Sequence, residues 1–180
     1  PETVQSLGTK EGFAEVCAAH GLRTPQSVAL PCGAPLPELP FGWPVIAKPA
    51  DSPAYWNCRF PGKRKVYLAN SAAELEEILA ATAQGGYHGA MLLQEYIPGP
   101  DTALGVVNAY CARDGSVPWI VQGQVLLQER TPEGMGNYGA ILTEPARQDT
   151  ALLTALADLL RQSGWRGYAN FDLKYTSAGE

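Results

Sequence analysis

The feature that most restricts the fold of this chain is a pair of strand-like runs in its second half that must pair antiparallel. Val106–Ala112 and Trp119–Leu127 are mostly apolar, and the turn sequence Arg113-Asp114-Gly115-Ser116 lies between them, which predicts a hairpin. Elsewhere, strands and helices do not alternate steadily, as a doubly wound parallel sheet would require. The sequence therefore predicts an α+β fold.

Three helices and four further strands are predicted from hydrophobic spacing and capping signals. The first helix is expected at about Lys10–His20, with Thr9 as its N-cap and Gly21 at its C-terminal end. Ser71-Ala72-Ala73-Glu74 matches a capping box and predicts a second helix, and the leucines between 152 and 160 predict a third. Strands are expected at 45–49, 65–69, 90–93 and 167–175, and the stretch 50–64 is expected to be irregular.

Composition narrows the class of protein. A net charge of -5 disfavours a nucleic-acid-binding protein, since such proteins are usually basic. The four cysteines form no C-x-x-C pair and there are only two histidines, so zinc-finger spacing is excluded and reduced thiols are expected. No run approaches the ~20 apolar residues that span a bilayer. Because the chain starts at Pro1 and stops at Glu180 just after a strand, we expect a segment of a longer cytoplasmic protein.

Two glycine-containing stretches match phosphate-binding motifs only in part. Gly134-Met135-Gly136-Asn137-Tyr138-Gly139 has the letters of the dinucleotide motif G-x-G-x-x-G. That motif needs a preceding strand and a following helix, whereas Thr131-Pro132-Glu133 precedes it and the strand-like Ala140–Thr143 follows. Gly62-Lys63-Arg64-Lys65 lacks the spacing of a P-loop. We reject both interpretations.

Lysines in the first half suggest an anion site. Lys48 lies within the apolar strand Val45–Pro49, and an ammonium buried there needs an anion to offset its desolvation. A strand-end lysine that reaches solvent would show the same pattern. Lys63 and Lys65 follow Gly62 at the end of the loop 51–65, which can fold over phosphates or form a solvated basic turn.

Two later segments suggest how a nucleotide and a metal could be held. Gln94-Glu95-Tyr96-Ile97-Pro98-Gly99 joins a strand end to a break, where backbone groups can pair with a heterocycle and Asp101 can accept from ribose hydroxyls. In 169–175, strand alternation places Asn170, Asp172 and Lys174 on one face, where a carboxylate can bind Mg²⁺. Taken singly, each segment also fits an ordinary strand end or a solvated face.

In this order, the motifs resemble the ATP-grasp superfamily, and among its members the carboxylate–amine ligases of the D-aspartate ligase and carbamoyl-phosphate synthase type. The stretches that carry the resemblance spread over nearly the whole chain: Lys10-Glu11-Gly12-Phe13, Val45–Pro49, Gly62–Tyr67, Gln94–Asp101, Gly136-Asn137-Tyr138 and Gly167–Tyr175. The resemblance implies two α+β lobes with mixed or antiparallel sheets that grip ATP. Residues 1–24 would form a helix on the larger lobe, 25–93 the small lobe with a flexible phosphate cover at 50–65, and 94–180 the larger lobe, incomplete at its C-terminus.

The resemblance also implies a ligand set of ATP and Mg²⁺. The expected ATP-binding residues are Lys10, Lys48, Lys63, Lys65, Glu95, Tyr96, Ile97 and Asp101, and the expected metal ligand is Asp172. The implied reaction phosphorylates a small-molecule carboxylate with ATP, and an amine then attacks the acyl phosphate.

The sequence departs from the family pattern near its end. The family follows the Asp-bearing strand with Glu-x-Asn-Pro-Arg, which would lie beyond the chain. Glu144-Pro145-Ala146-Arg147 only mimics that motif, and Thr176 stands where relatives tend to have aspartate. We therefore expect these residues alone to bind nucleotide weakly and to lack activity without the N- and C-terminal parts of the parent protein.

Two other functions remain open at this point. A non-catalytic nucleotide-binding module with a regulatory or scaffolding role would use the same residues. A nucleic-acid-binding module would use Lys63-Arg64-Lys65 with Tyr55 and Trp56.

Overall fold

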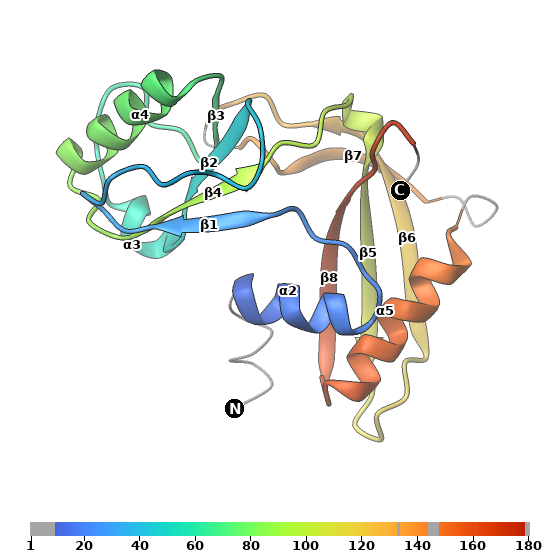
Figure 1. Cartoon of the computed structure of the whole chain (residues 1–180). Coiled ribbons are helices and arrows are strands. Elements are labelled where there is room, and N and C mark those ends of the chain that lie inside the picture. Colours follow the sequence, from blue (N-terminus) through green and yellow to red (C-terminus); the bar gives the residue numbers. More distant parts are fainter. Residues whose placement is uncertain (1–9, 133, 144–147, 179–180) are drawn as a thin grey trace. The chain divides into compact units, whose positions relative to one another are not determined.

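The computed structural model describes residues 10–132, 134–143 and 148–178, and its description of side chains begins at Gly12 (Figure 1). The chain divides into two compact units. Unit 1 comprises residues 1–24, 98–127 and 138–180, and unit 2 comprises residues 25–97 and 128–137. Thr9, the expected N-cap, and Glu144–Arg147 lie outside the described residues.

Unit 2 is built on an antiparallel sheet in the order β1-β4-β2-β3. Its elements are β1 (Ser27–Leu30), β2 (Val45–Pro49), α3 (Ser52–Trp56), β3 (Tyr67–Ala69), α4 (Ala72–Gln84) and β4 (Met91–Glu95). The core includes alternate residues of the two central strands, among them Val45, Ala47 and Leu93, together with Leu75 of α4. Helix α4 therefore covers one face of the sheet (Figure 1).

Unit 1 is built on a second sheet, in the order β7-β6-β5-β8. Its elements are α2 (Lys10–Ala19), the 3₁₀ helix η1 (Asp101–Ala103), β5 (Leu104–Cys111), β6 (Trp119–Gln128), β7 (Tyr138–Leu142), α5 (Thr150–Gln162) and β8 (Gly167–Lys174). Cys17 of α2 and the leucines of α5 pack with Val107, Ala109 and Phe171, which share one face of the sheet. The opposite face carries no helix among the described residues.

The predicted hairpin is confirmed. β5 and β6 pair antiparallel with Tyr110 opposite Trp119, and Gly115 in the turn has φ of +90°. Strand β5 also pairs antiparallel with β8. Every strand pairing with a defined register is therefore antiparallel, which agrees with the predicted α+β fold.

Helix ends follow the predicted capping chemistry, with one difference. Gly21 follows α2 with φ of +69°, and Leu22 N–H donates to Cys17 O, as expected of a glycine C-cap. Ser71 Oγ accepts from Glu74 N–H, but the Glu74 carboxylate accepts from Asn70 N–H and Nδ2 instead of closing the capping box on Ser71.

Three expectations require correction or refinement. The stretch 50–64 is not irregular throughout, because Asp51 Oδ1 accepts from Ala54 N–H and caps helix α3. The third strand begins at Tyr67 rather than at Lys65. Compared with the expected lobe limits of 1–24, 25–93 and 94–180, residues 94–97 and 128–137 group with unit 2. Backbone bonding explains part of this grouping, since Lys65 N–H donates to Pro132 O.

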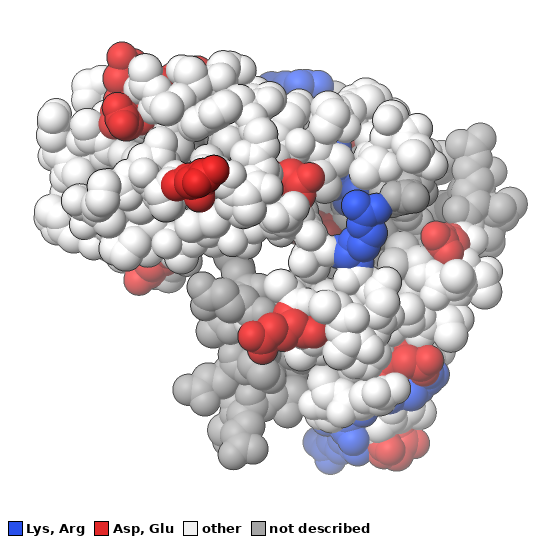
Figure 2. All heavy atoms as spheres, viewed as in Figure 1, with Lys and Arg blue, Asp and Glu red and all other residues white. Residues whose placement is uncertain are grey.

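Three further findings concern the helices, the thiols and the charged surface. Among the described helices, none is long and apolar enough to cross a bilayer. All four cysteines are free thiols, as expected, and only Cys32 is exposed. Figure 2 shows basic and acidic side chains next to one another at the lower end of unit 1.

Candidate functional site

Lys48 lies on the face of the unit 2 sheet that points away from α4. Val45, Ala47 and Pro49 are buried, as expected for the neighbours of this lysine, while Lys48 itself is half-buried. Alternation along the strand is the reason, because it sends every second side chain to the opposite face. Lys48 Nζ donates to Gln94 Oε1 at 2.9 Å on that face. This bond orients the Lys48 ammonium.

Lys63, in the loop after α3, points back into unit 2. Its Nζ donates to Trp56 O at 3.0 Å and Cys58 O at 2.8 Å, and it lies 4.9 Å from the centroid of the Tyr55 ring. These contacts fasten the loop to the C-terminal end of α3. A flexible phosphate cover was expected here, but the described loop is held by its own cation.

Lys65 reaches a second segment of unit 2. Its Nζ donates to Asn137 Oδ1 at 3.0 Å, and Asn137 Nδ2 donates to Glu129. The hydrogen bonds from Asn137 Nδ2 and Thr131 Oγ1, together with the positive charge of Lys65, hold the pKa of the Glu129 carboxyl below its usual value. A Cβ at Gly134 would lie 2.0 Å from Glu129 Cδ, so a larger residue there would displace the Glu129 carboxylate.

The structure adds Arg64, which was not among the predicted site residues. Arg64 N–H donates to Tyr67 Oη at 2.9 Å, and Tyr55 Oη donates to Arg64 O at 2.9 Å. The two hydroxyls are 2.6 Å apart, and since Tyr55 already donates to Arg64, Tyr67 is the donor between them. This closed circuit fixes the backbone of Arg64 while its side chain stays exposed.

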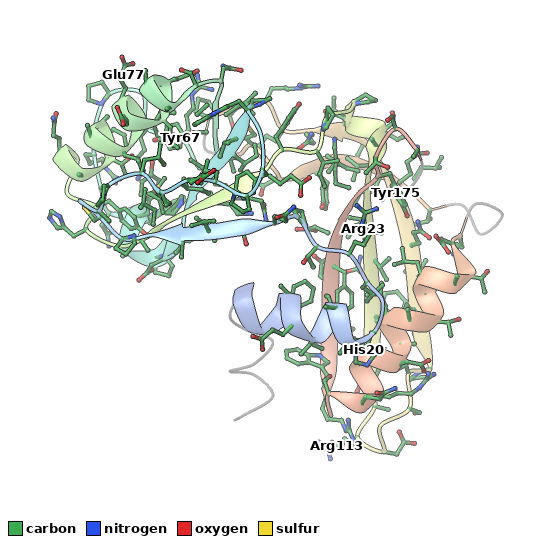
Figure 3. The ribbon with its side chains drawn as sticks, viewed as in Figure 1. His20, Arg23, Tyr67, Glu77, Arg113 and Tyr175 are labelled. Carbon is green, nitrogen blue, oxygen red and sulfur yellow. The ribbon has the colours of Figure 1, made fainter. Side chains whose placement is uncertain are left out.

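Tyr67 lies inside unit 2 (Figure 3). Burial, then the hydrogen bond with Tyr67, raises the pKa of Tyr55, so the Tyr55 hydroxyl keeps its proton at neutral pH. The sequence contained the Lys-Arg-Lys run but gave no sign of this circuit, because the two tyrosines lie nine and three residues from Arg64.

The end of β4 carries the residues expected to meet a heterocycle. Glu95 N–H donates to Gln26 O at 2.9 Å. The register opposes these two residues as a pair that normally exchanges two backbone bonds, yet Gln26 N–H donates to Glu95 Oε2 at 3.2 Å instead. Gln26 N–H therefore does not make the second backbone bond of this pair, to the Glu95 carbonyl. Tyr96 and Ile97 follow as half-buried, non-strand residues.

Asp101 begins η1 in unit 1. Lys174 Nζ donates to the carbonyls of Gly99 and Pro100, at 3.2 and 3.3 Å, just before it. Burial lowers the pKa of Lys174, and the negative charge of Asp101 partly opposes that shift. The ammonium of β8 therefore helps to fix the segment that presents the Asp101 carboxylate.

Asp172 is exposed on the helix-free face of the unit 1 sheet, as strand alternation predicted. Tyr138 Oη donates to Asp172 Oδ1 at 2.6 Å. On the same face, Asn170 Nδ2 donates to Asn108 Oδ1 at 3.1 Å across the β5–β8 pair. Lys10, the remaining predicted site residue, is the first residue of α2, and its side chain lies outside the described residues.

The described side chains bear on the expected Mg²⁺ site. No group of three or more His, Cys, Asp or Glu that could hold a metal occurs among the described residues. Mg²⁺ is commonly held in proteins by one or two carboxylates plus substrate phosphates and water. Asp172, with one oxygen bonded to Tyr138, fits such a site as a single protein carboxylate.

Comparison with known proteins supports the expected fold. No protein-family model matches the sequence. The chain is 33% identical over 176 residues to D-aspartate ligase of Enterococcus faecium, which covers 95% of this chain and 41% of the relative. The likeness covers nearly the whole of this chain, which has the ATP-grasp fold. The chain spans about two fifths of that relative's length.

Solved structures agree on the ATP-grasp fold. L-amino acid ligase from Bacillus licheniformis matches 98% of this chain and 39% of its own, with a TM-score of 0.66 and 16% identity. The biotin carboxylase domain of 2-oxoglutarate carboxylase from Hydrogenobacter thermophilus, solved with MgADP, matches 99% of this chain and 39% of its own, with a TM-score of 0.66 and 13% identity.

Proposed function

We propose that this chain forms the nucleotide- and Mg²⁺-binding core of an ATP-dependent carboxylate–amine ligase. The similarity to D-aspartate ligase supports the reaction class. The observation that carries the proposal is Lys48, whose ammonium lies beside Gln94 on the face of the unit 2 sheet that points away from α4. A compact ammonium suits a phosphate group, and the exposed Arg64 and Lys65 add positive charge in the same unit.

The remaining residues receive roles by unit. In unit 2, the Glu95 carbonyl and the backbone of Ile97 pair with the adenine, beside the ring of Tyr96. In unit 1, Asp101 accepts from the ribose hydroxyls and Asp172 is a ligand of Mg²⁺. Lys10 and Lys63 complete the proposed ATP-binding set, although the contacts of Lys63 point it toward carbonyls.

In the proposed reaction, an oxygen of the substrate carboxylate attacks the γ-phosphorus of ATP, and ADP leaves. The amine then attacks the acyl carbon, and phosphate leaves as the amide forms. Mg²⁺, when bound, neutralises charge on the phosphates. The chain's own residues bind and orient the nucleotide, so catalysis depends on positioning and electrostatics rather than on a protein nucleophile.

The proposal also covers the cellular location of the protein and its substrates. Four free thiols fit a reducing cytoplasm. D-Aspartate is the first amino acid to test, because the 33% identical relative is named for it. A range of carboxylic acids and amines should follow, with ADP release from MgATP as the readout on the full-length polypeptide.

Lys48→Met tests the site directly. Removing the ammonium should abolish the thermal stabilisation by ADP and Mg²⁺, which for saturating ligand corresponds to roughly 2–4 kcal/mol. Arg113→Met, at the β5–β6 turn, is the control for the loss of one positive charge. If Lys48→Met responds to nucleotide like the wild type, the placement of the phosphates is wrong.

The second candidate is a nucleotide-binding module with a regulatory or scaffolding role. It would use the same Lys48 and Asp172 contacts, which bear on nucleotide binding and not on phosphoryl transfer. Nucleotide-induced stabilisation without any ADP release by the full-length polypeptide would select this function.

A further inference from the structure

The hydrogen bond between Tyr138 and Asp172 is the contact from which we infer a further role. Asp172 lies near the end of β8 on the open face of the sheet, where an exposed carboxylate can turn freely unless something holds it. Its Oδ1 accepts from Tyr138 Oη at 2.6 Å. An ionised carboxylate has no proton to give, so the tyrosine is the donor, and bonds of this charge-assisted type are short and strong.

The neighbours of Asp172 on this face are unsuited to the same task. Across the sheet, the residues in register with it are Val106 and Gly123, which have no side-chain donor. Along β8, Asn170 Nδ2 is bonded to Asn108, and Lys174 Nζ is bonded to the carbonyls before Asp101. The orientation of the carboxylate therefore depends on Tyr138.

Tyr138 is placed to hold one oxygen of Asp172 and leave the other available. Its ring is half-buried at the start of β7, so the position of its hydroxyl is set by the packing of the ring. Because only Oδ1 takes part in this bond, Oδ2 of Asp172 is left for another partner.

We propose that Tyr138 is a positioning residue that fixes Asp172 for Mg²⁺ binding and touches neither metal nor nucleotide itself. The inference rests on the proposed role of Asp172 as a Mg²⁺ ligand. Residues that hydrogen-bond a metal ligand commonly change metal affinity about 10- to 100-fold when they are lost. Tyr138 should therefore act on metal affinity and leave metal-free nucleotide binding alone.

The experiment compares wild type, Tyr138→Phe, Asp172→Asn and Tyr110→Phe. Tyr138→Phe removes only the hydroxyl. Tyr110→Phe is a matched control on the same sheet, where the Tyr110 ring packs at a tilt against that of Tyr168. Calorimetry measures the affinity for ADP in EDTA and at increasing MgCl₂. The readout is the MgCl₂ concentration that gives half of the metal-dependent gain in ADP affinity.

Tyr138→Phe should raise that concentration about 10-fold or more, with ADP affinity in EDTA unchanged, and Tyr110→Phe should match wild type. If Asp172→Asn loses the Mg²⁺ dependence but Tyr138→Phe equals wild type, the role of Tyr138 is refuted and the proposed function survives. Equal loss of ADP affinity with and without metal in Tyr138→Phe would show a merely structural role and also refute it. If Asp172→Asn keeps the full Mg²⁺ dependence, Asp172 is not a Mg²⁺ ligand, and the proposed role of Tyr138 is refuted as well.

Discussion

At the scale of single residues, hydroxyl groups fix the parts of this chain that matter for binding. The circuit of Tyr55, Tyr67 and Arg64 uses each hydroxyl once as donor and once as acceptor. A buried polar group that loses its partner costs more free energy than the bond itself contributes, because it must be desolvated without compensation. The backbone of Arg64 therefore depends on both tyrosines.

Tyr67→Phe should lower the free energy of unfolding by about 1–3 kcal/mol, since it strands Arg64 N–H and removes the donor to Tyr55. Urea denaturation measures the change. Tyr168→Phe is the control, because that ring is 78% exposed. A Tyr67→Phe variant as stable as wild type would mean that the circuit contributes nothing to stability.

At the scale of elements, close packing around one glycine sets the place of β7. Gly123 on β6 has no side chain, and a Cβ there would lie 2.5 Å from Ile141 Cγ2 of β7. Val106 of β5 adjoins the same position, with Cγ1 3.4 Å from that Cβ. Strand β7 carries Tyr138, so a displaced β7 would also disturb the bond to Asp172.

Gly123→Ala should therefore destabilise the protein by about 1–3 kcal/mol through overpacking. Ile141→Ala in the same chain should recover much of the loss, and a double-mutant cycle by urea denaturation measures the coupling. Gly42→Ala is a suitable control, because its Cβ would meet no atom within 4 Å. Purely additive effects of the two substitutions would contradict this account of the packing.

At the scale of the whole molecule, buried thiols make the free energy of unfolding depend on pH in the alkaline range. Burial raises the pKa of Cys17 from 9.0 to about 11 and raises that of Cys111 as well. A group whose pKa is higher in the folded state stabilises that state below its unfolded pKa. The stabilisation is lost as pH rises, because the unfolded state releases the proton first.

The unfolding free energy should accordingly fall between pH 9 and 11. Cys17→Val should remove roughly 2 kcal/mol of the pH dependence between pH 8 and 10.5, at about 1.4 kcal/mol per pKa unit. Denaturant titrations at the two pH values measure it. Cys32→Val, at an exposed thiol, is the control, and an equal effect of both variants would contradict the assignment to Cys17.

The sequence by itself determined most of the helices and strands and the faces that β8 exposes and buries. The hairpin of β5 and β6, the caps at Ser71 and Gly21, and the exposed position of Asp172 all follow from local pattern, because turn chemistry, capping and alternation act over a few residues. The order of motifs was enough to point to the ATP-grasp superfamily.

Only the tertiary structure decided which groups meet. The contact of Tyr138 with Asp172 joins residues 34 apart, and that of Lys48 with Gln94 joins residues 46 apart. The helix after Asp51, by contrast, has a local signal, an Asp N-cap followed by Pro53, that the prediction of an irregular stretch missed. Strand pairing over long separations places the partners of the two long-range contacts together, and sequence spacing carries no record of the register in which distant strands align.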